Sequence, residues 1–355
     1  MKIRSIALAA VALAMISCGG GVKKAAFTTI SGTVEDTTLT EVRVTVASPK
    51  LDTVLTIENG KFAIEVPESE KSYGMIILME QGRGKYGSYY IPDGTNLTVA
   101  QKAEDVTVVS DKEGANNAYS QYVEALSKIY VAESDTMMEE LEALWTETVK
   151  SNPDNGIAIL VISDASYYLT PEKKIGLIDL LDESIKEDKK ISSIIASANA
   201  QKNTAEGMMF TDFTVEHVYG YDRSVDPQPL KKEVKFSDYV GKGKYVLVDF
   251  WSPWCGPCRR EMPNIKTVYE QYKDKGLEVL SLAVWERKPQ SHTIEVAGEL
   301  GMDWLHINNC GKIPTDIYGV EGIPHLMLVG PDGTILKRGF HGLEGIQEAV
   351  AEYIK

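Results

Sequence analysis

Two cysteines, Cys255 and Cys258, separate a strand-like run at 244–250 from a helix-like run that begins at Arg259. A Cys-x-x-Cys pair between a strand and a helix is typical of a dithiol that cycles with a disulfide. The start of a helix offers unpaired backbone N–H groups and the positive end of its dipole, both of which favour the thiolate of Cys255. Cys258, three residues later, returns to the same helix face and reaches the first sulfur. We therefore expect a nucleophilic Cys255 sulfur, half exposed at the helix start.

The first residues have the pattern of an export signal. A basic start at 1–4 precedes an apolar stretch at 6–16 and small residues, so we interpret 1–17 as a signal peptide. Cys18 follows directly, and this resembles the lipobox of bacterial lipoproteins, which implies lipidation of the Cys18 sulfur. A plain cleaved signal is the alternative. Diacyl anchoring supplies the buried chains that stable attachment requires.

The remainder of the chain offers no run of the roughly 20 apolar residues that a membrane-spanning helix needs. We therefore expect residues 18–26 to be a tether, with the body lipid-anchored to a membrane of the cell envelope and facing the periplasm. The 51 acidic and 37 basic side chains give a net charge of −14, which argues against nucleic-acid binding. Four cysteines are few for an exported protein, so disulfides are not its framework.

Two regions precede the cysteine pair. Short β-rich runs alternate with turn signals over 27–110 and predict a small β-sandwich, with Asn59-Gly60 as a hairpin turn between strands. It resembles a β-module of unknown function found ahead of thioredoxin-like domains in bacterial lipoproteins, so scaffolding or partner recognition is expected. Helical spacing over 111–205 predicts a helical segment whose aromatic residues form its core.

From 207 to 355 strands and helices alternate, which predicts an α/β layer arrangement. The expected strands are Val246 to Phe250, Leu277 to Val284, Leu326 to Val329 and Thr334 to Arg338. The expected helices are Cys255 to Lys273, Ser291 to Leu300 and Leu343 to Ile354. A turn at Gly330-Pro331-Asp332-Gly333 connects the last two strands.

This last region resembles the thioredoxin fold, and within it the TlpA/ResA-type thiol-disulfide oxidoreductases. The resemblance lies in Val248 to Cys258, in Arg259 to Pro263, and in Gly322-Ile323-Pro324-His325, which matches the loop with the family's cis-proline. It implies an α/β thioredoxin-like C-terminal domain. It also implies that Cys255 attacks the substrate and that Cys258 resolves the mixed disulfide.

The resemblance assigns roles to further residues. Asp249 lies in a buried strand, where burial raises its pKa, so that it can exchange protons with Cys258. The alternative for Asp249 is a hydrogen-bonded strand residue without a chemical role. Trp254 presents a flat apolar surface beside the dithiol. Ile323 binds the substrate main chain while Pro324, in cis, packs beside the sulfurs; an ordinary trans-proline is the alternative.

Several residues leave alternatives open. His325 stands where relatives often have Thr, and it either tunes substrate choice or pH response or is a partly exposed loop residue. Cys310 is a reactive third thiol or, as we favour, an inert one. A zinc site built from Cys255, Cys258, His325 or Cys310 is disfavoured because no second cysteine pair exists. A peroxiredoxin-type peroxidase is disfavoured because the Pro/Thr-bearing loop before its single cysteine is absent.

We therefore predict a membrane-tethered periplasmic protein-disulfide reductase with no cofactor other than the Cys255–Cys258 disulfide. Its partners are protein thiols and disulfides, possible cytochrome apoproteins among them, and a membrane electron donor. Gly256-Pro257 and Asp249 resemble reducing thioredoxins, whose potential is about −270 mV, rather than oxidants at about −120 mV. A net oxidant or isomerase and a non-catalytic binding lipoprotein remain as alternatives.

Overall fold

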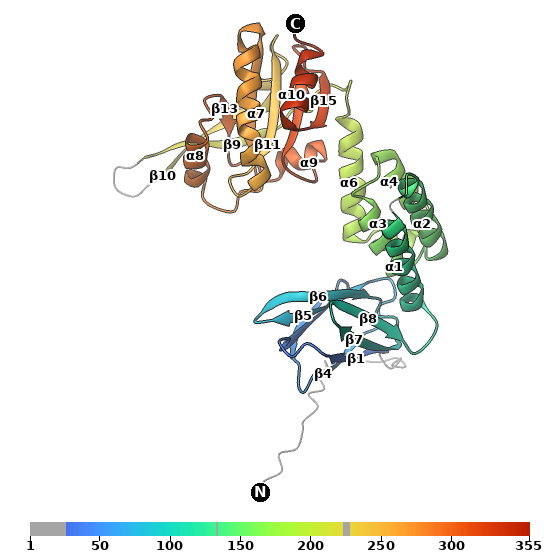
Figure 1. Cartoon of the computed structure of the whole chain (residues 1–355). Coiled ribbons are helices and arrows are strands. Elements are labelled where there is room, and N and C mark those ends of the chain that lie inside the picture. The colour runs from blue at the N-terminus through green and yellow to red at the C-terminus, as the bar shows by residue number, and fades with distance from the viewer. Residues whose placement is uncertain (1–25, 133, 223–227) are drawn as a thin grey trace, which may run out of the picture. The chain divides into compact units, whose positions relative to one another are not determined.

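The computed structural model describes residues 26–132, 134–222 and 228–355. The chain forms two compact units, the first ending at Ser120 and the second beginning at Gln121 (Figure 1). The predicted signal peptide, Cys18 and all of the predicted tether except Ala26 lie outside the described residues. Over the described ranges, no helix has both the length and the apolar character that crossing a bilayer demands.

The first unit contains a β-sandwich of two four-stranded sheets, with strand orders β4-β1-β7-β8 and β3-β2-β5-β6. Its strands are β1 Phe27–Val34, β2 Glu41–Val46, β3 Leu51–Thr56, β4 Lys61–Pro67, β5 Gly74–Glu80, β6 Arg83–Tyr90, β7 Asn96–Lys102 and β8 Asp105–Ser110. Alternate residues face the core between the sheets, as Val42, Val44 and Val46 of β2 show. The alternation in the sequence thus gives the expected β-sandwich.

The turn predicted at Asn59-Gly60 is present, but the predicted pairing of the two strands on either side of it is wrong. Both residues have positive φ values, 52° and 72°, and Glu58 and Lys61 exchange backbone hydrogen bonds of 2.9 and 3.0 Å across them. The strands on either side then separate, because β3 pairs with β2 whereas β4 pairs with β1 in the other sheet. The Gly60 carbonyl accepts a hydrogen bond from Val34 N–H at 2.8 Å, which holds the turn against β1. The turn therefore connects two sheets instead of two paired strands.

Helices follow the sandwich, as the 3.6-residue periodicity predicts. They are α1 Ala115–Ala132, α2 Met137–Ser151, α3 Gly156–Ala165, α4 Pro171–Ile178, α5 Glu183–Lys186 and α6 Lys189–Asn203. The side chain of Asn155 caps α3, and that of Thr170 caps α4, which begins with Pro171. Trp145 of α2 and Tyr122 of α1 are buried, whereas Tyr167 is 74% and Tyr168 54% exposed, so the expectation that the aromatic residues form the core is only partly correct.

The thioredoxin-like domain contains a five-stranded sheet of order β13-β12-β11-β14-β15. Its elements are β9 Thr214–Asp222, β10 Gln228–Lys235, η1 Phe236–Asp238, β11 Tyr245–Trp251, α7 Gly256–Tyr272, η2 Lys273–Lys275, β12 Leu277–Ala283, α8 Gln290–Glu299, β13 Leu305–Ile307, α9 Ile313–Tyr318, β14 His325–Val329, β15 Ile335–Phe340 and α10 Gly342–Ala351. Strands β12 and β13 run parallel to β11, and β14 runs antiparallel to it. The expected strands and helices of this region are all present.

The central strand β11 is buried on both faces and separates two cores. Leu247 and Trp251 face the core that α7 and α10 cover. Val248 and Phe250 face the other core, which the β9–β10 hairpin and α9 close (Figure 1). This layering is the α/β architecture predicted for 207–355, with an additional hairpin that the sequence did not reveal.

The helices contact the thioredoxin-like domain through α6 and α9. Gln201 of α6 donates a hydrogen bond of 2.7 Å from Nε2 to the carbonyl oxygen of Gly319. A Cβ atom at residue 319 would lie 2.5 Å from the backbone oxygen of Ser197, so this close approach requires glycine. Glu321, three residues before Pro324, accepts from Ser197 Oγ at 2.8 Å and from Lys174 Nζ at 2.9 Å. The helical segment thereby fixes the chain that leads into the proline loop.

We predict that Glu321→Gln lowers the free energy of unfolding by about 2 kcal/mol or more. The Lys174 side chain is only 3% exposed, so its ammonium would remain buried without a carboxylate partner. The matched control is Glu142→Gln, which breaks the ion pair of the neighbouring Lys173, a side chain that is 54% exposed. This control should cost less than about 1 kcal/mol. Denaturant unfolding of the oxidised chain measures both, and equal costs would contradict the structural role of the buried pair.

Candidate active site

The dithiol lies where β11 passes into α7, as the sequence predicts. Cys255 is the N-cap of α7, and a disulfide joins it to Cys258 in the first turn of the helix. The backbone N–H of Cys258 donates a hydrogen bond of 3.1 Å to the sulfur of Cys255. In the reduced state this N–H and the dipole of α7 stabilise a thiolate on Cys255 more than a thiol. Cys255 therefore has the position at the helix start that the sequence predicts for the attacking sulfur.

The expectation that Cys255 is half exposed is wrong, because the residue is only 3% exposed in the disulfide form. Its sulfur lies 3.7 Å from the carbonyl oxygen of Ile323, in the loop that leads to Pro324. Ile323 and Pro324 are themselves partly exposed, and the Ile323 carbonyl forms part of the rim around the sulfur. The sulfur is thus covered by the loop that the sequence assigns to substrate binding.

The proline loop has the expected conformation. The Ile323–Pro324 peptide bond is cis, and the trans alternative does not apply. The loop leads directly into β14, whose first residue, His325, pairs with Phe250 at the end of β11. Because β11 also precedes the dithiol, the pairing of these two strands brings Cys255 and Ile323 to the same edge of the sheet. The structure therefore unites two motifs that are far apart in the chain, since the sequence separation of Cys255 and Ile323 is 68.

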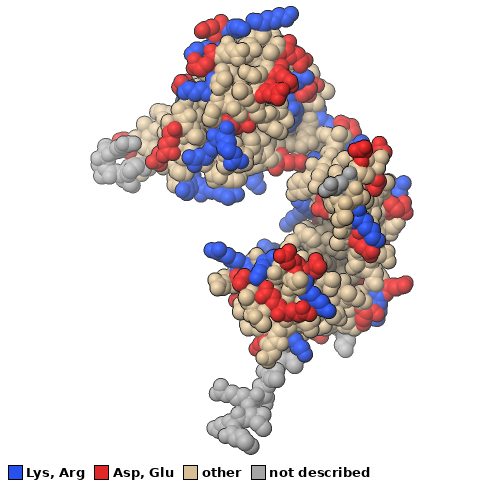
Figure 2. All heavy atoms as spheres, viewed as in Figure 1, with Lys and Arg blue, Asp and Glu red and all other residues tan. Residues whose placement is uncertain are grey.

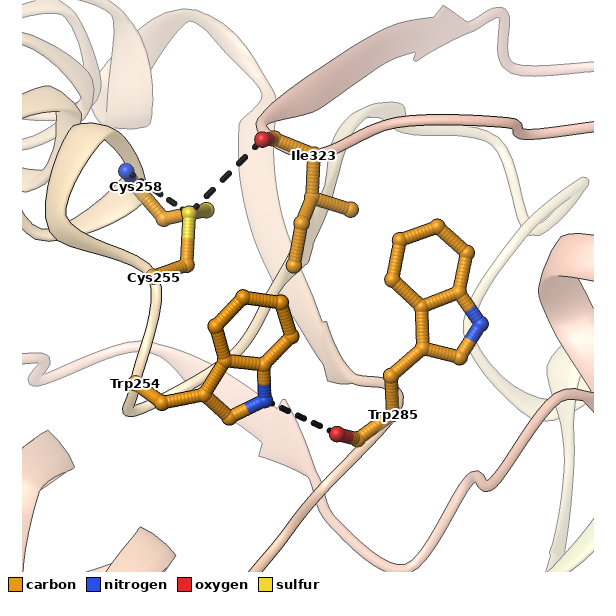
Figure 3. The surroundings of a disulfide bond; sticks show 5 residues. All are labelled: Trp254, Cys255, Cys258, Trp285 and Ile323. Atoms are coloured by element: carbon orange, nitrogen blue, oxygen red, sulfur yellow. Dashed lines mark hydrogen bonds between the residues drawn. A yellow bond between two sulfur atoms is a disulfide. The ribbon is translucent and has the colours of Figure 1, made fainter. Parts of the chain in front are cut away.

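Trp254 lies beside Cys255, and Trp285 lies next to Trp254 (Figure 3). Trp254 is 40% exposed, and its indole Nε1 donates a hydrogen bond of 2.8 Å to the carbonyl oxygen of Trp285. Trp285 has a positive φ of 52°, and its own Nε1 donates to Thr315 Oγ1 at 3.1 Å. These bonds hold Trp254 as a fixed, flat surface next to Cys255, as its predicted role requires.

Asp249 is fully buried in β11. Burial raises its pKa to about 7, the Ser281 hydrogen bond opposes that rise, and the nearby carboxylate of Glu261 adds to it. Ser281 Oγ donates to Asp249 Oδ2 at 3.0 Å and accepts from Trp304 Nε1 at 3.0 Å. Asp249 Oδ1 has no hydrogen-bond partner among the described side chains and backbone. The carboxyl group is therefore able to gain or lose a proton near neutral pH.

His325 lies against β11 instead of in an exposed loop. Its ring packs edge-on against Phe250 at 5.7 Å, and its Nε2 lies 3.4 Å from Nη2 of Arg338. Burial, together with the charges of Arg338 and His341, lowers its pKa to about 3. His325 is therefore neutral throughout the physiological range, and a pH response near neutrality is not its role.

Cys310 is buried in the core on the face of the sheet opposite the disulfide. Burial raises the pKa of its thiol well above the ordinary value, and Glu286 raises it further. This favours the inert thiol over the reactive one. His325 packs toward the same opposite face, through Phe250. The four residues considered for zinc are therefore divided between two faces of the sheet and do not form one site.

Sequence reasoning missed the residues that support the site from a distance. Ser281 donates to the carboxylate of Asp249, Trp304 donates to the Ser281 hydroxyl, and the Trp285 carbonyl oxygen accepts from Trp254. One signal could have pointed to both Ser281 and Trp285. Ser281 lies in β12 and Trp285 lies just after it, and β12 runs parallel to β11, the strand that precedes the dithiol. Parallel strands bring their carboxyl ends to one edge of a sheet, where functional residues gather.

Known proteins resemble the thioredoxin-like part of the chain. The sequence model of the AhpC/TSA family matches residues 207–338. The thiol-disulfide oxidoreductase ResA of Bacillus subtilis (strain 168) is 27% identical over 137 residues, which are 39% of this chain and 68% of the relative. The protein of the same name from Bacillus thuringiensis subsp. konkukian is 32% identical over 124 residues, 35% of this chain and 68% of the relative.

Among solved structures, the chain is similar to the thioredoxin domain of a thiol-disulfide oxidoreductase from Bacteroides vulgatus. The identity is 27% and the TM-score 0.35, with 42% of this chain and 99% of that chain covered. The two ResA proteins share with this chain a stretch that spans about two thirds of their own length. Through its thioredoxin-like domain, with the cysteine pair at the start of α7, this chain belongs to the family of ResA-type thiol-disulfide oxidoreductases.

Proposed function

We propose that this protein reduces disulfides in exported proteins, with Cys255 and Cys258 as its redox-active dithiol. The observation that supports the proposal best is the environment of Cys255. Its sulfur accepts the N–H of Cys258 at the start of α7 and faces the carbonyl oxygen of Ile323 in the proline loop. A nucleophile and a backbone edge for an extended substrate thus lie side by side.

The reaction begins with attack of the Cys255 thiolate on one sulfur of a substrate disulfide. A bond forms between Cys255 and that sulfur, the substrate disulfide breaks, and the other substrate sulfur leaves as a thiolate. The main chain of Ile323 holds the substrate segment, while Pro324 and Trp254 pack beside it. The substrate reaches the sulfur by displacing part of the rim that covers Cys255.

The mixed disulfide is resolved by Cys258. The unpartnered Asp249 Oδ1 accepts the proton of the Cys258 thiol, and the resulting thiolate attacks the sulfur of Cys255. The second substrate sulfur leaves and is protonated, so the substrate gains two electrons and the dithiol becomes the disulfide. A membrane electron donor then returns two electrons, two protons are taken up, and the dithiol is restored.

The reductive direction and the location are part of the same proposal. Gly256-Pro257 between the cysteines and the buried Asp249 favour a reducing potential near that of thioredoxin, about −270 mV. The signal-like residues 1–17 and the lipobox-like Cys18 favour a lipid anchor and a periplasmic body, with apoproteins of cytochromes among the possible substrates. A measured Cys255–Cys258 potential above about −180 mV would select a net oxidant or isomerase instead.

One observation favours a second candidate, a binding lipoprotein whose thioredoxin-like domain only recognises partners. Cys255 is 3% exposed, and a buried sulfur that reacts with no disulfide would serve no catalysis. Reaction of the reduced protein with a small disulfide separates the two candidates, because it requires only access to the sulfur. Complete failure to react would select the binding protein.

We predict that Cys255→Ser reduces insulin-disulfide reduction to the uncatalysed rate, since a serine hydroxyl is a poor nucleophile toward sulfur. Precipitation of the insulin B chain in the presence of dithiothreitol measures the rate. The matched control is Cys310→Ala, which removes the buried third thiol and should retain the activity. Activity that survived in Cys255→Ser would refute the mechanism.

Cys258→Ser should instead accumulate mixed disulfides on Cys255, because the resolving thiol is gone while the attacking one remains. Isolation of the variant from the cell envelope and mass spectrometry of the attached proteins identify the substrates. A Cys255→Ser/Cys258→Ser double variant controls for adhesion without a covalent bond. Equal recovery from both variants would contradict covalent capture.

Asp249→Asn should stabilise the folded protein in a pH-dependent way. The folded-state pKa of about 7 lies above the ordinary 3.8, so between these values the folded state holds a proton that the unfolded state releases. The free energy of unfolding of the native chain therefore falls as pH rises from about 4 to 7. The gain from Asp249→Asn should be small at pH 4 and reach at most about 4 kcal/mol at pH 8. A gain of equal size at both pH values, measured by denaturant unfolding, would contradict the buried charge.

A further inference from the structure

Four exposed cations surround the dithiol on two elements. Arg259 and Arg260 directly follow Cys258 in α7, and Arg287 and Lys288 lie in the loop between β12 and α8. Figure 2 shows Lys and Arg side chains gathered on this domain around the ends of α7 and α8. Within 26–132, 134–222 and 228–355, no carboxylate lies at ion-pair distance from any of the four. A chain with a net charge of −14 thus leaves cations unpaired beside its reactive sulfur.

The acidic neighbours of these cations point inward. Glu286 precedes Arg287, and its carboxylate accepts from Thr293 Oγ1 at 2.5 Å and from Asn309 N–H at 2.6 Å. Glu261 follows Arg260, is 8% exposed, and accepts from Gly342 N–H at 2.9 Å. Internal hydrogen bonds therefore occupy the carboxylates, while the adjacent cations face solvent. The exposed charge around the dithiol is locally positive.

Arg287 has the most defined position of the four. The central carbon of its guanidinium lies 3.7 Å from the centroid of the Trp254 ring. Trp254 is itself fixed by its hydrogen bond to Trp285, so the cation rests on a rigid surface next to Cys255. Stacking uses the face of a guanidinium and leaves its N–H edge free to bind a carboxylate with two parallel hydrogen bonds.

We propose that the protein substrates carry an acidic residue beside the cysteine that Cys255 attacks, and that Arg287 binds its carboxylate. Lys288, Arg259 and Arg260 add a local positive field that favours an acidic segment and disfavours a basic one. This inference rests on the proposed function and specifies the substrate class for it. Arg287 acts here as a specificity determinant, because it contacts the substrate on the solvent-exposed side of Trp254.

The test compares two synthetic peptides, each with one disulfide, that differ only in Glu or Lys at the residues flanking the cysteines. With the reduced full chain, kcat/KM should be about fivefold higher for the Glu peptide at low salt, and the preference should shrink at high salt. Arg287→Gln should abolish most of the preference, and Arg287→Glu should reverse it. Arg287→Lys, which keeps the charge but loses the planar fork, should fall between them.

The control variant is Lys242→Glu, which changes the net charge as much as Arg287→Glu does. Lys242 is exposed and lies before the start of β11, at the opposite end of the strand from the dithiol. The preference of the Lys242→Glu variant for the Glu peptide should equal that of the native protein. Equal rates for the two peptides, a preference for the Lys peptide, or equal effects of the Lys242 and Arg287 variants would overturn the proposal.

Hydroxyethyl disulfide, an uncharged small substrate, separates this proposal from the proposed function. The Lys242→Glu variant should reduce it at the native rate, and far-UV circular dichroism checks that the Arg287 variants are folded. If the native protein reduces it but does not distinguish the peptides, the acidic-substrate inference fails alone. If the native protein does not reduce it, the proposed reductase function fails and the inference falls with it.

Discussion

The pairing of β11 with β14 is the constraint on which the site depends. It aligns Phe250 with His325, so the chain leaving one strand and the chain entering the other meet at one edge of the sheet. The dithiol follows the first and the cis-proline loop precedes the second, which brings the Cys255 sulfur within 3.7 Å of the Ile323 carbonyl oxygen. A slip of the register by one residue would reverse which side chains face each core and would separate the two loops.

The same strand sets the chemistry behind the sulfurs. Because β11 is covered on both faces, the carboxyl group of Asp249 is removed from water, and this desolvation is the main cause of its raised pKa. The Trp304–Ser281–Asp249 chain of hydrogen bonds satisfies one carboxyl oxygen and leaves the other available. On the outer side, Trp254 and Arg287 face solvent. The dithiol thus lies between a buried carboxyl group with a raised pKa and an outer side that exposes Trp254 and Arg287.

Features that depend on neighbouring residues were predictable from the sequence, whereas features that depend on contacts between distant segments were not. The strand-to-helix setting of Cys255 and Cys258, the Thr170-Pro171 cap and the Gly330–Gly333 turn depend on neighbouring residues, so the sequence reveals them. The prediction of a hairpin at Asn59-Gly60 was wrong because a turn depends on neighbouring residues, whereas strand pairing depends on distant ones. β10 was missed because Val234 is its only buried residue, and β13 has three residues. The burial of Cys255 and the support from Trp285 and Ser281 arise from segments distant in the chain.

The contacts between the helical segment and the thioredoxin-like domain have a consequence for experiments on the domain alone. Arg338 of β15 donates to the Thr204 carbonyl and hydroxyl oxygens just after α6, and Glu321 depends on Lys174 and Ser197. A fragment cut at residue 207 would lose all of these partners, including one that fixes the approach to Pro324. In an excised fragment, the segment that leads to Pro324 would therefore lack contacts that hold it in the full chain.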